Sequence, residues 1–230
     1  MSTARKLFRE TAVLLRLKWR LWLAMLVVAT AGAIFIYAHD SIWIKHVIAA
    51  NNPAIHKLAQ KISFWGDFFR GWLILIGFIA LLGWLVRKPA LRICALAALL
   101  AGLSAGAQTQ LLSSLIGRPR PSVTKTNQLQ GLTLARRYKS FPSSHTSCAF
   151  AVATTLAANS VALSPFYFGA AAAVGWSRMA LKAHYPSDVW AGMWFGIING
   201  LLFGLAARRT SMAHRACRGK NNLLQPPKQT

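Results

Sequence analysis

Long apolar runs separated by short polar segments are the dominant pattern of this chain. A helix needs about 20 mostly apolar residues to cross the hydrocarbon core of a bilayer. Six runs reach or approach that length, at 19–38, 68–86, 90–116, 146–163, 165–181 and 189–207. The pattern therefore predicts an all-α fold in which residues 19–207 form a six-helix transmembrane bundle.

The segment between the first two predicted spans, 41–63, has a different periodicity. Its apolar residues recur at helical spacing with lysines and histidines between them, and Pro53 interrupts the run. Helices of this kind lie in the membrane interface with the apolar face toward lipid. We expect one or two short amphipathic helices there, on the outer face of the membrane.

Composition supports a membrane protein. Hydrophobic residues make up 55% of the chain and charged residues only 13%, against about 25% charged in a typical soluble domain. The net charge is +23, with 27 Lys and Arg against four Asp and Glu. The basic residues gather between the apolar runs, as in loops that face anionic lipid. Membrane lipid is thus the expected partner, nucleic acid is disfavoured, and nothing indicates an obligate protein partner.

Basic residues near the ends of the spans predict the orientation, because Lys and Arg accumulate on the cytoplasmic side. The basic N-terminal segment 1–18, the turn at 87–92 and the basic tail 208–230 fall on one side of a six-span bundle. Both termini are therefore expected in the cytoplasm of a bacterium, with the bundle in its inner (plasma) membrane. The end of the tail, 219–230, has the composition of a disordered segment.

The loop 117–140 is basic although it falls on the outer side. An anionic ligand would explain why cations are placed against the topology rule. Its basic residues are Arg118, Arg120, Lys125, Arg136, Arg137 and Lys139.

A second polar cluster begins the fourth predicted span. Pro142 sets the chain direction, Ser143 or Ser144 can cap the helix, and His145 lies on its first turn. A helix N-terminus binds anions through its free amides. The plainer alternative is a capped helix with an interfacial histidine.

The third cluster bridges the fifth and sixth spans. His184 and Asp188 are four residues apart, with Pro186 between them at a position suited to a helix start. Asp188 can accept a hydrogen bond from one ring nitrogen of His184 and leave the other nitrogen as a nucleophile. Arg178 offers a fork that matches phosphate oxygens. The alternative is an interfacial ion pair of Asp188 with Arg178 or Lys182. Asp67, near the outer end of the second span, is expected to pair with Arg70; contact with a substrate headgroup is the alternative.

These clusters together resemble the phosphatidic acid phosphatase type 2 superfamily. The signature of that family is Lys-x6-Arg-Pro, then Pro-Ser-Gly-His, then Ser-Arg-x5-His-x3-Asp. The third part matches in full, from Ser177-Arg178 to His184 and Asp188, and the second appears as 142–145. The first appears as Arg118-Pro119 without its lysine, because residue 111 is leucine.

The resemblance implies roles for these residues. His184 would attack phosphorus, with Asp188 orienting it, and His145 would protonate the departing oxygen. Arg118, Arg178 and the amides of Ser143 and Ser144 would hold the phosphate. The family works without a metal, so no metal or cofactor is expected, in agreement with a chain too poor in carboxylates for a two-metal site.

Two departures from the signature bear on the site. Leu111 stands where the family has a phosphate-binding lysine, and the possible substitutes are Gln110, Arg120, Lys125, Arg136, Arg137 and Lys139. Ser144 stands where the family has glycine, a change that a helix N-terminus tolerates well.

The function favoured by the sequence is hydrolysis of a lipid phosphate at the extracytoplasmic face. Undecaprenyl pyrophosphate, phosphatidylglycerol phosphate, phosphatidic acid and the phosphates of lipid A are the candidate substrates. Two alternatives use the same residues: a lipid-to-lipid phosphotransferase, and a non-catalytic lipid-binding or transport relative, which the loss of the lysine would favour.

Overall fold

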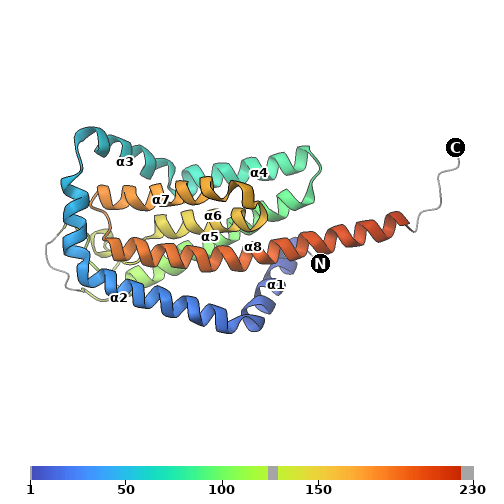
Figure 1. Cartoon of the computed structure of the whole chain (residues 1–230), viewed down its shortest axis with the longest axis horizontal. Helices are drawn as coiled ribbons and strands as arrows, with labels where there is room; N and C mark the ends of the chain where they lie inside the picture. The colour runs from blue at the N-terminus through green and yellow to red at the C-terminus, as the bar shows by residue number, and fades with distance from the viewer. Residues whose placement is uncertain (1, 124–128, 224–230) are drawn as a thin grey trace.

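The computed structural model describes residues 2–123 and 129–223, with side chains as far as residue 214. Every regular element in those residues is a helix (Figure 1). The elements are α1 (Thr3–Leu17), α2 (Trp19–Ala49), α3 (Pro53–Trp65), η1 (Phe68–Trp72), α4 (Leu73–Leu85), α5 (Pro89–Ile116), η2 (Arg136–Tyr138), α6 (Ser144–Asn159), η3 (Val161–Leu163), α7 (Ser164–Ala180) and α8 (Pro186–Leu223). The expected all-α fold is confirmed.

Four helical segments in the described residues are long and apolar enough to cross a membrane. They are Trp19–Ala49, Phe68–Leu85, Pro89–Ile116 and Pro186–His214. The fourth and fifth predicted spans coincide with α6 and α7, which have 16 and 17 residues. The six-span count therefore remains a prediction, while the membrane character of the chain is clear.

The connection after the first span differs from the expectation. Helix α2 continues without interruption to Ala49, beyond the predicted end at residue 38, because no helix-breaking residue lies in between. Pro53 then begins α3 instead of interrupting a helix, and the side chain of Asn52 caps α3 by accepting from the amide of Ile55 at 2.9 Å. Helix α3 packs against α7 (Figure 1).

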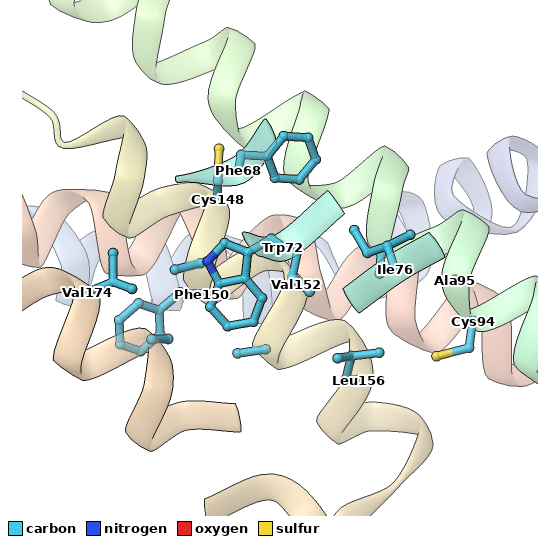
Figure 2. Close-up of a cluster of buried hydrophobic side chains, with 14 residues drawn as sticks. Phe68, Trp72, Ile76, Cys94, Ala95, Cys148, Phe150, Val152, Leu156 and Val174 are labelled. Carbon is cyan, nitrogen blue, oxygen red and sulfur yellow. The ribbon is translucent and has the colours of Figure 1, made fainter. Parts of the chain in front are cut away.

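Helix α6 forms the centre of the bundle and packs on α5, α7 and α8. Residues 146–157 of α6 are all buried, so this helix has no face left for lipid. Figure 2 shows the cluster on one of its sides, where Phe150, Val152 and Leu156 lie among Trp72 of η1 and Ile76 of α4. A central helix enclosed in this way holds its N-terminus, which carries His145, in a fixed position.

A row of glycines lets α8 approach α6 closely. Gly192, Gly196, Gly200 and Gly204 recur every four residues on α8. A Cβ atom added at Gly192 would lie 2.5 Å from the carbonyl oxygen of Ser143, and one at Gly196 would lie 2.5 Å from that of Ser147. Small residues at this spacing are typical of tightly packed membrane helices. The contact fixes the start of α6 relative to α8.

The three basic segments of the topology prediction meet at one end of the bundle. A cavity there is lined by Lys6 of α1, Arg92 of α5 and Arg209 of α8, and the α4–α5 turn lies at the same end (Figure 1). The N-terminal segment is part of the fold, because Leu7 and Leu14 of α1 are buried against the bundle. Helix α8 continues to Leu223, through residues 219–223 for which the sequence predicts disorder; residues 224–230 lie outside the described part.

Candidate active site

A polar cavity of about 290 Å³ lies among the loops that follow α5 and α7 and the start of α6. Both predicted catalytic histidines line it, although they are 39 positions apart in the chain. The full lining is Gln110, Arg120, Arg136, Lys139, Ser144, His145, Arg178 and His184. The fold therefore brings together one histidine from each of two separate motifs, with four cationic side chains around them.

His184 lies in the loop between α7 and α8 and is 3% exposed. Its Nδ1 atom is 2.7 Å from the carbonyl oxygen of Ser140. A carbonyl oxygen only accepts, so Nδ1 carries the proton and Nε2 keeps its lone pair. Burial lowers the pKa of His184 below the ordinary value of 6.5, and the carboxylate of Asp188 opposes that shift. The ring is thus favoured in its neutral form, with a lone pair on Nε2.

Asp188 orients His184 by a less direct route than the sequence suggests. Its Oδ2 atom is 3.6 Å from Nδ1 of His184, too far for a hydrogen bond. Oδ2 instead accepts from the hydroxyl of Ser140 and from the amide of Tyr185, the latter at 2.7 Å. Asp188 therefore fixes Ser140, and the carbonyl group of Ser140 fixes the imidazole.

His145 lies on the first turn of α6, and its partner was not foreseen. Its Nε2 atom is 3.4 Å from Oδ2 of Asp67. The predicted pair of Asp67 with Arg70 is wrong, because the guanidinium of Arg70 stacks 4.4 Å over the ring of Phe64 instead. Asp67 caps η1 by accepting from the amide of Phe69 at 3.1 Å, which aims its second oxygen toward His145. An acceptor in this place can stabilise a protonated His145.

The cations around His145 act against that protonation. Burial and, after it, the positive charge of Arg178 lower the pKa of His145 to about 3. A phosphate that binds among these cations brings negative charge to the same space and offsets them. Protonation of His145 is therefore expected to accompany the binding of an anion.

At the start of α6, the two serines that were expected to hold phosphate have different contacts. Ser143 is the N-cap, but its hydroxyl makes no capping bond, and its amide donates to the carbonyl oxygen of Asp188 at 3.0 Å. The amide of Ser143, which the sequence predicts to hold phosphate, is thus already bonded to Asp188 in this structure. Ser144 lines the cavity, and its backbone is helical, without positive φ. The first-turn amides without a side-chain cap leave an anion site at Ser144.

Two arginines of the cavity have a buried nitrogen without a partner. The Nε atoms of Arg120 and Arg178 make no hydrogen bond within the described residues. The guanidinium of Arg178 donates to the hydroxyl of Ser63 of α3. Burial and, after it, the charge of nearby Arg136 lower the pKa of Arg120. Buried donors and uncompensated positive charge are the features of an anion site.

Arg118 does not line this cavity, contrary to the prediction that it binds phosphate. It is 1% exposed, and its guanidinium lies 2.8 Å from Asp40 and 2.5 Å from Asp188. The rings of Tyr37 and Tyr185 cover it at 4.7 and 4.2 Å. Gly117, at φ 65°, ends α5 and turns the chain, so that residue 118 points inward and Arg120 reaches the cavity.

The Arg-Pro pair whose arginine lines the cavity is therefore Arg120-Pro121. If the signature Lys-x6-Arg-Pro is counted back from Arg120, the lysine position is Ser113. Ser113 is buried, and its hydroxyl donates to the carbonyl group of Gln110. Leu111 is 63% exposed and faces away from the site. Counted in this register, the lysine position lies two residues beyond Leu111.

Other candidates to replace the lysine fall into three groups. Gln110, Arg136 and Lys139 line the cavity with Arg120. Arg137 is exposed, and its guanidinium lies 5.1 Å from the ring of Tyr138, outside the cavity. Lys125 lies outside the described residues. Arg136 and Lys139 thus supply cations where α5 supplies none.

Sequence reasoning assigned no role to Asp40 and missed the contact of Asp67 with His145. Asp67 contacts His145, and Asp40 contacts Arg118 and the start of α8. The available signal was their rarity: they are two of only four acids, and an ionisable residue at the end of a span is a functional candidate by default.

Comparisons with known proteins show which family the chain belongs to. The PAP2 superfamily model matches residues 93–210. The bacitracin transport permease protein BcrC of Bacillus licheniformis is 26% identical over 164 residues, which are 71% of this chain and 75% of that protein.

Two solved structures share the fold at 22% identity each. A PAP2-type transmembrane phosphatidylglycerolphosphate phosphatase from Bacillus subtilis has a TM-score of 0.58 and covers 91% of this chain and 98% of its own. LpxE of Aquifex aeolicus has a TM-score of 0.55 and covers 70% and 92%.

The fold and the match to the family model define the class: this chain is a membrane protein of the phosphatase type. It belongs to the PAP2 superfamily.

Proposed function

We propose that this protein is a lipid phosphate phosphatase that works through a phosphohistidine on His184. The observation that carries the proposal is the tautomer of His184. Its Nδ1 is held by the carbonyl group of Ser140, which leaves an unprotonated Nε2 beside a cationic cavity that also contains His145. A neutral imidazole with a fixed proton is an activated nucleophile.

Phosphate binding is assigned to the cations of the cavity. The Nε atoms of Arg120 and Arg178, without a partner in the described residues, are donors for phosphate oxygens, and Ser144 lines the same cavity at the start of α6. Arg136 and Lys139 add positive charge from the loop. Donors placed in this way also stabilise the charge that develops on the transferring phosphoryl group.

The reaction has two steps. In the first, Nε2 of His184 forms a bond to phosphorus, the bond from phosphorus to the lipid oxygen breaks, and His145, protonated when the substrate binds, gives its proton to that oxygen. Asp67, at 3.4 Å, stabilises the imidazolium of His145 before this transfer. In the second, His145 takes a proton from water, the water oxygen bonds to phosphorus, and the P–N bond breaks to release inorganic phosphate.

The position of the cavity in the bundle bears on the side of the membrane that the site faces. The cavity lies at the end of the bundle away from α1, the α4–α5 turn and the end of α8, which carry the basic segments (Figure 1). The positive-inside rule therefore favours an extracytoplasmic site in an inner membrane with both termini in the cytoplasm. Candidate substrates remain undecaprenyl pyrophosphate, phosphatidylglycerol phosphate, phosphatidic acid and lipid A phosphates, and the second of these is the lipid after which the similar Bacillus subtilis phosphatase is named.

The test compares phosphate release from these four lipids by the purified wild type and by His184→Ala, in detergent. His46→Ala is the matched control, because His46 is a histidine of α2 outside the cavity. We expect release from at least one lipid by wild type and control, and a loss of at least about 1,000-fold in His184→Ala, as for removal of a nucleophile. Equal release by wild type and His184→Ala would exclude the mechanism.

A radiolabelled donor lipid separates hydrolysis from phosphotransfer. Label recovered as inorganic phosphate supports the phosphatase, and label recovered in a second lipid would replace it by a phosphotransferase that uses the same histidine.

A further inference from the structure

Asp40 is a buried acid of α2 with no place in the two-step reaction. It is 0% exposed. Its Oδ2 atom accepts from Arg118 at 2.8 Å and from the hydroxyl of Ser187, and its Oδ1 atom accepts from the amide of Ser187 at 2.9 Å. Three donors, one of them cationic, therefore converge on this carboxylate and hold it in place.

We propose that Asp40 is a positioning residue for the catalytic histidine, acting through Arg118 and the first turn of α8. This inference rests on the function proposed above. Asp40 is distant in sequence from all three motifs, and it lies on a helix outside the matched family region, which begins at residue 93.

Two routes lead from Asp40 toward His184. In the first, Asp40 binds both the amide and the hydroxyl of Ser187 and so fixes the turn that carries the next residue, Asp188. In the second, Asp40 and Asp188 share the guanidinium of Arg118, while Asp188 binds the hydroxyl of Ser140.

Both routes end on the same residue, Ser140. The amide of Ser140 donates to the carbonyl oxygen of Arg118 at 3.0 Å, and the carbonyl oxygen of Ser140 accepts from Nδ1 of His184. Loss of Asp40 would therefore loosen the group that sets the tautomer of His184, although Asp40 itself does not line the cavity.

The charges of Asp40, Arg118 and Asp188 give Asp40 an effect on the protonation of His184 that a merely structural residue lacks. With both acids ionised, Asp40, Arg118 and Asp188 together carry −1. Asp40→Asn raises the sum to 0, Arg118→Gln lowers it to −2, and the double variant restores −1. A more positive surrounding disfavours the imidazolium of His184, and a more negative one favours it.

The other charged or titratable groups around His184 stay the same in all of these variants. They are Arg120 and the loop residues Arg136 and Lys139, His145 of α6, Arg178 of α7 and Asp188 of α8. Differences between the variants therefore report on the Asp40–Arg118 pair.

The experiment measures kcat/KM for phosphate release from dioctanoyl phosphatidic acid in detergent micelles as a function of pH. It compares the wild type, Asp40→Asn, Arg118→Gln and the double variant. Glu10→Gln is the matched acid-to-amide control, because Glu10 lies on α1 and pairs with Arg209 at 3.7 Å. The ionisation of the substrate is common to all proteins and cancels in the comparison.

We expect the acid limb of the profile to move to lower pH by about half a unit in Asp40→Asn and to higher pH in Arg118→Gln. The double variant should return to the wild-type limb, while Glu10→Gln never leaves it. In Asp40→Asn we also expect kcat to fall about tenfold with KM changed by less than a factor of about two, because substrate contacts are kept. If Arg118→Gln is not recovered folded, Asp40→Asn and the double variant carry the test.

An acid limb that is the same in Asp40→Asn, the double variant and the wild type would overturn the role of Asp40. The inclusion of His184→Ala keeps the two proposals apart. Activity that is lost in His184→Ala but has an unshifted profile in Asp40→Asn refutes only the role of Asp40. Activity retained in His184→Ala refutes the proposed function itself.

Discussion

The Nδ1 atom of His184 lies 2.7 Å from the carbonyl oxygen of Ser140. This contact links the loop before α6 to the loop before α8, and it decides which ring nitrogen carries the proton. The hydroxyl of the same serine binds Asp188. Ser140 thus links Asp188 to His184. The four-residue spacing of these two residues had suggested a direct bond between them.

Ser140→Ala tests this link. It removes the hydroxyl that binds Asp188 and keeps the carbonyl group, so His184 loses support and keeps its partner. Hydrogen bonds to charged groups contribute about 1.5–3 kcal/mol, and we expect kcat to fall about tenfold or more with KM nearly unchanged.

Ser147→Ala is the matched control for that substitution. Ser147 is buried on α6, and its hydroxyl has no partner among the described residues. Its removal should leave kcat within a factor of about two. A Ser140→Ala protein as active as this control would contradict the indirect role of Asp188.

The protonation of His184 can be observed directly. Because burial lowers its pKa below 6.5, the ring stays neutral and nucleophilic as the pH falls through 6.5, and it becomes protonated only at lower pH. The measurement is an NMR titration of ¹⁵N-histidine-labelled protein in detergent, with the signal assigned by its absence in His184→Gln. Titration of that signal at or above pH 6.5 would refute the predicted direction.

Arg120, not Arg118, should bind the phosphate. Arg120→Gln removes a cation and a donor from the cavity, for which we expect a loss of about 10- to 100-fold in kcat/KM, measured by phosphate release. Arg137→Gln, an exposed arginine of the same loop outside the cavity, should stay within a factor of about two. Equal effects of the two substitutions would remove Arg120 from the phosphate site.

The missing lysine gives a further prediction. Lys139 lines the cavity, whereas residue 111 is exposed and faces away from it. Lys139→Gln should therefore raise KM for a lipid phosphate several-fold by removing one positive charge from the site. Leu111→Lys should give no gain in kcat/KM and should not rescue Lys139→Gln. Rescue by Leu111→Lys would restore the register in which Arg118 binds phosphate.

The sequence predicted the helical fold well because apolar length and periodicity are local properties. It placed the ends of helices less well: α2 runs on to Ala49 because its amphipathic end has no breaker. The burial of α6 on all sides could not be foreseen, since an Ala-rich run looks the same whether neighbouring helices or lipid surround it.

The sequence predicted the cavity-lining residues that belong to its second and third motifs. His145, His184 and Arg178 meet at one cavity, as their motifs indicated. The spacing of residues could not show that the turn at Gly117 buries Arg118 and brings Arg120 to the cavity, because this turn depends on a single positive φ. Nor could it find the partners of Asp40 and Asp67, because these lie far away in the chain, on α8 and at the start of α6.

The most direct test of the phosphohistidine on His184 is to trap it. Wild type, His184→Gln and His145→Gln are mixed with a ³²P-labelled lipid phosphate that the wild type hydrolyses, quenched with alkali within milliseconds, and the protein-bound label is mapped to a peptide. We expect an alkali-stable, acid-labile label on the peptide that contains His184, and none in His184→Gln. Label on another residue, or hydrolysis by His184→Gln at the wild-type rate, would contradict the mechanism.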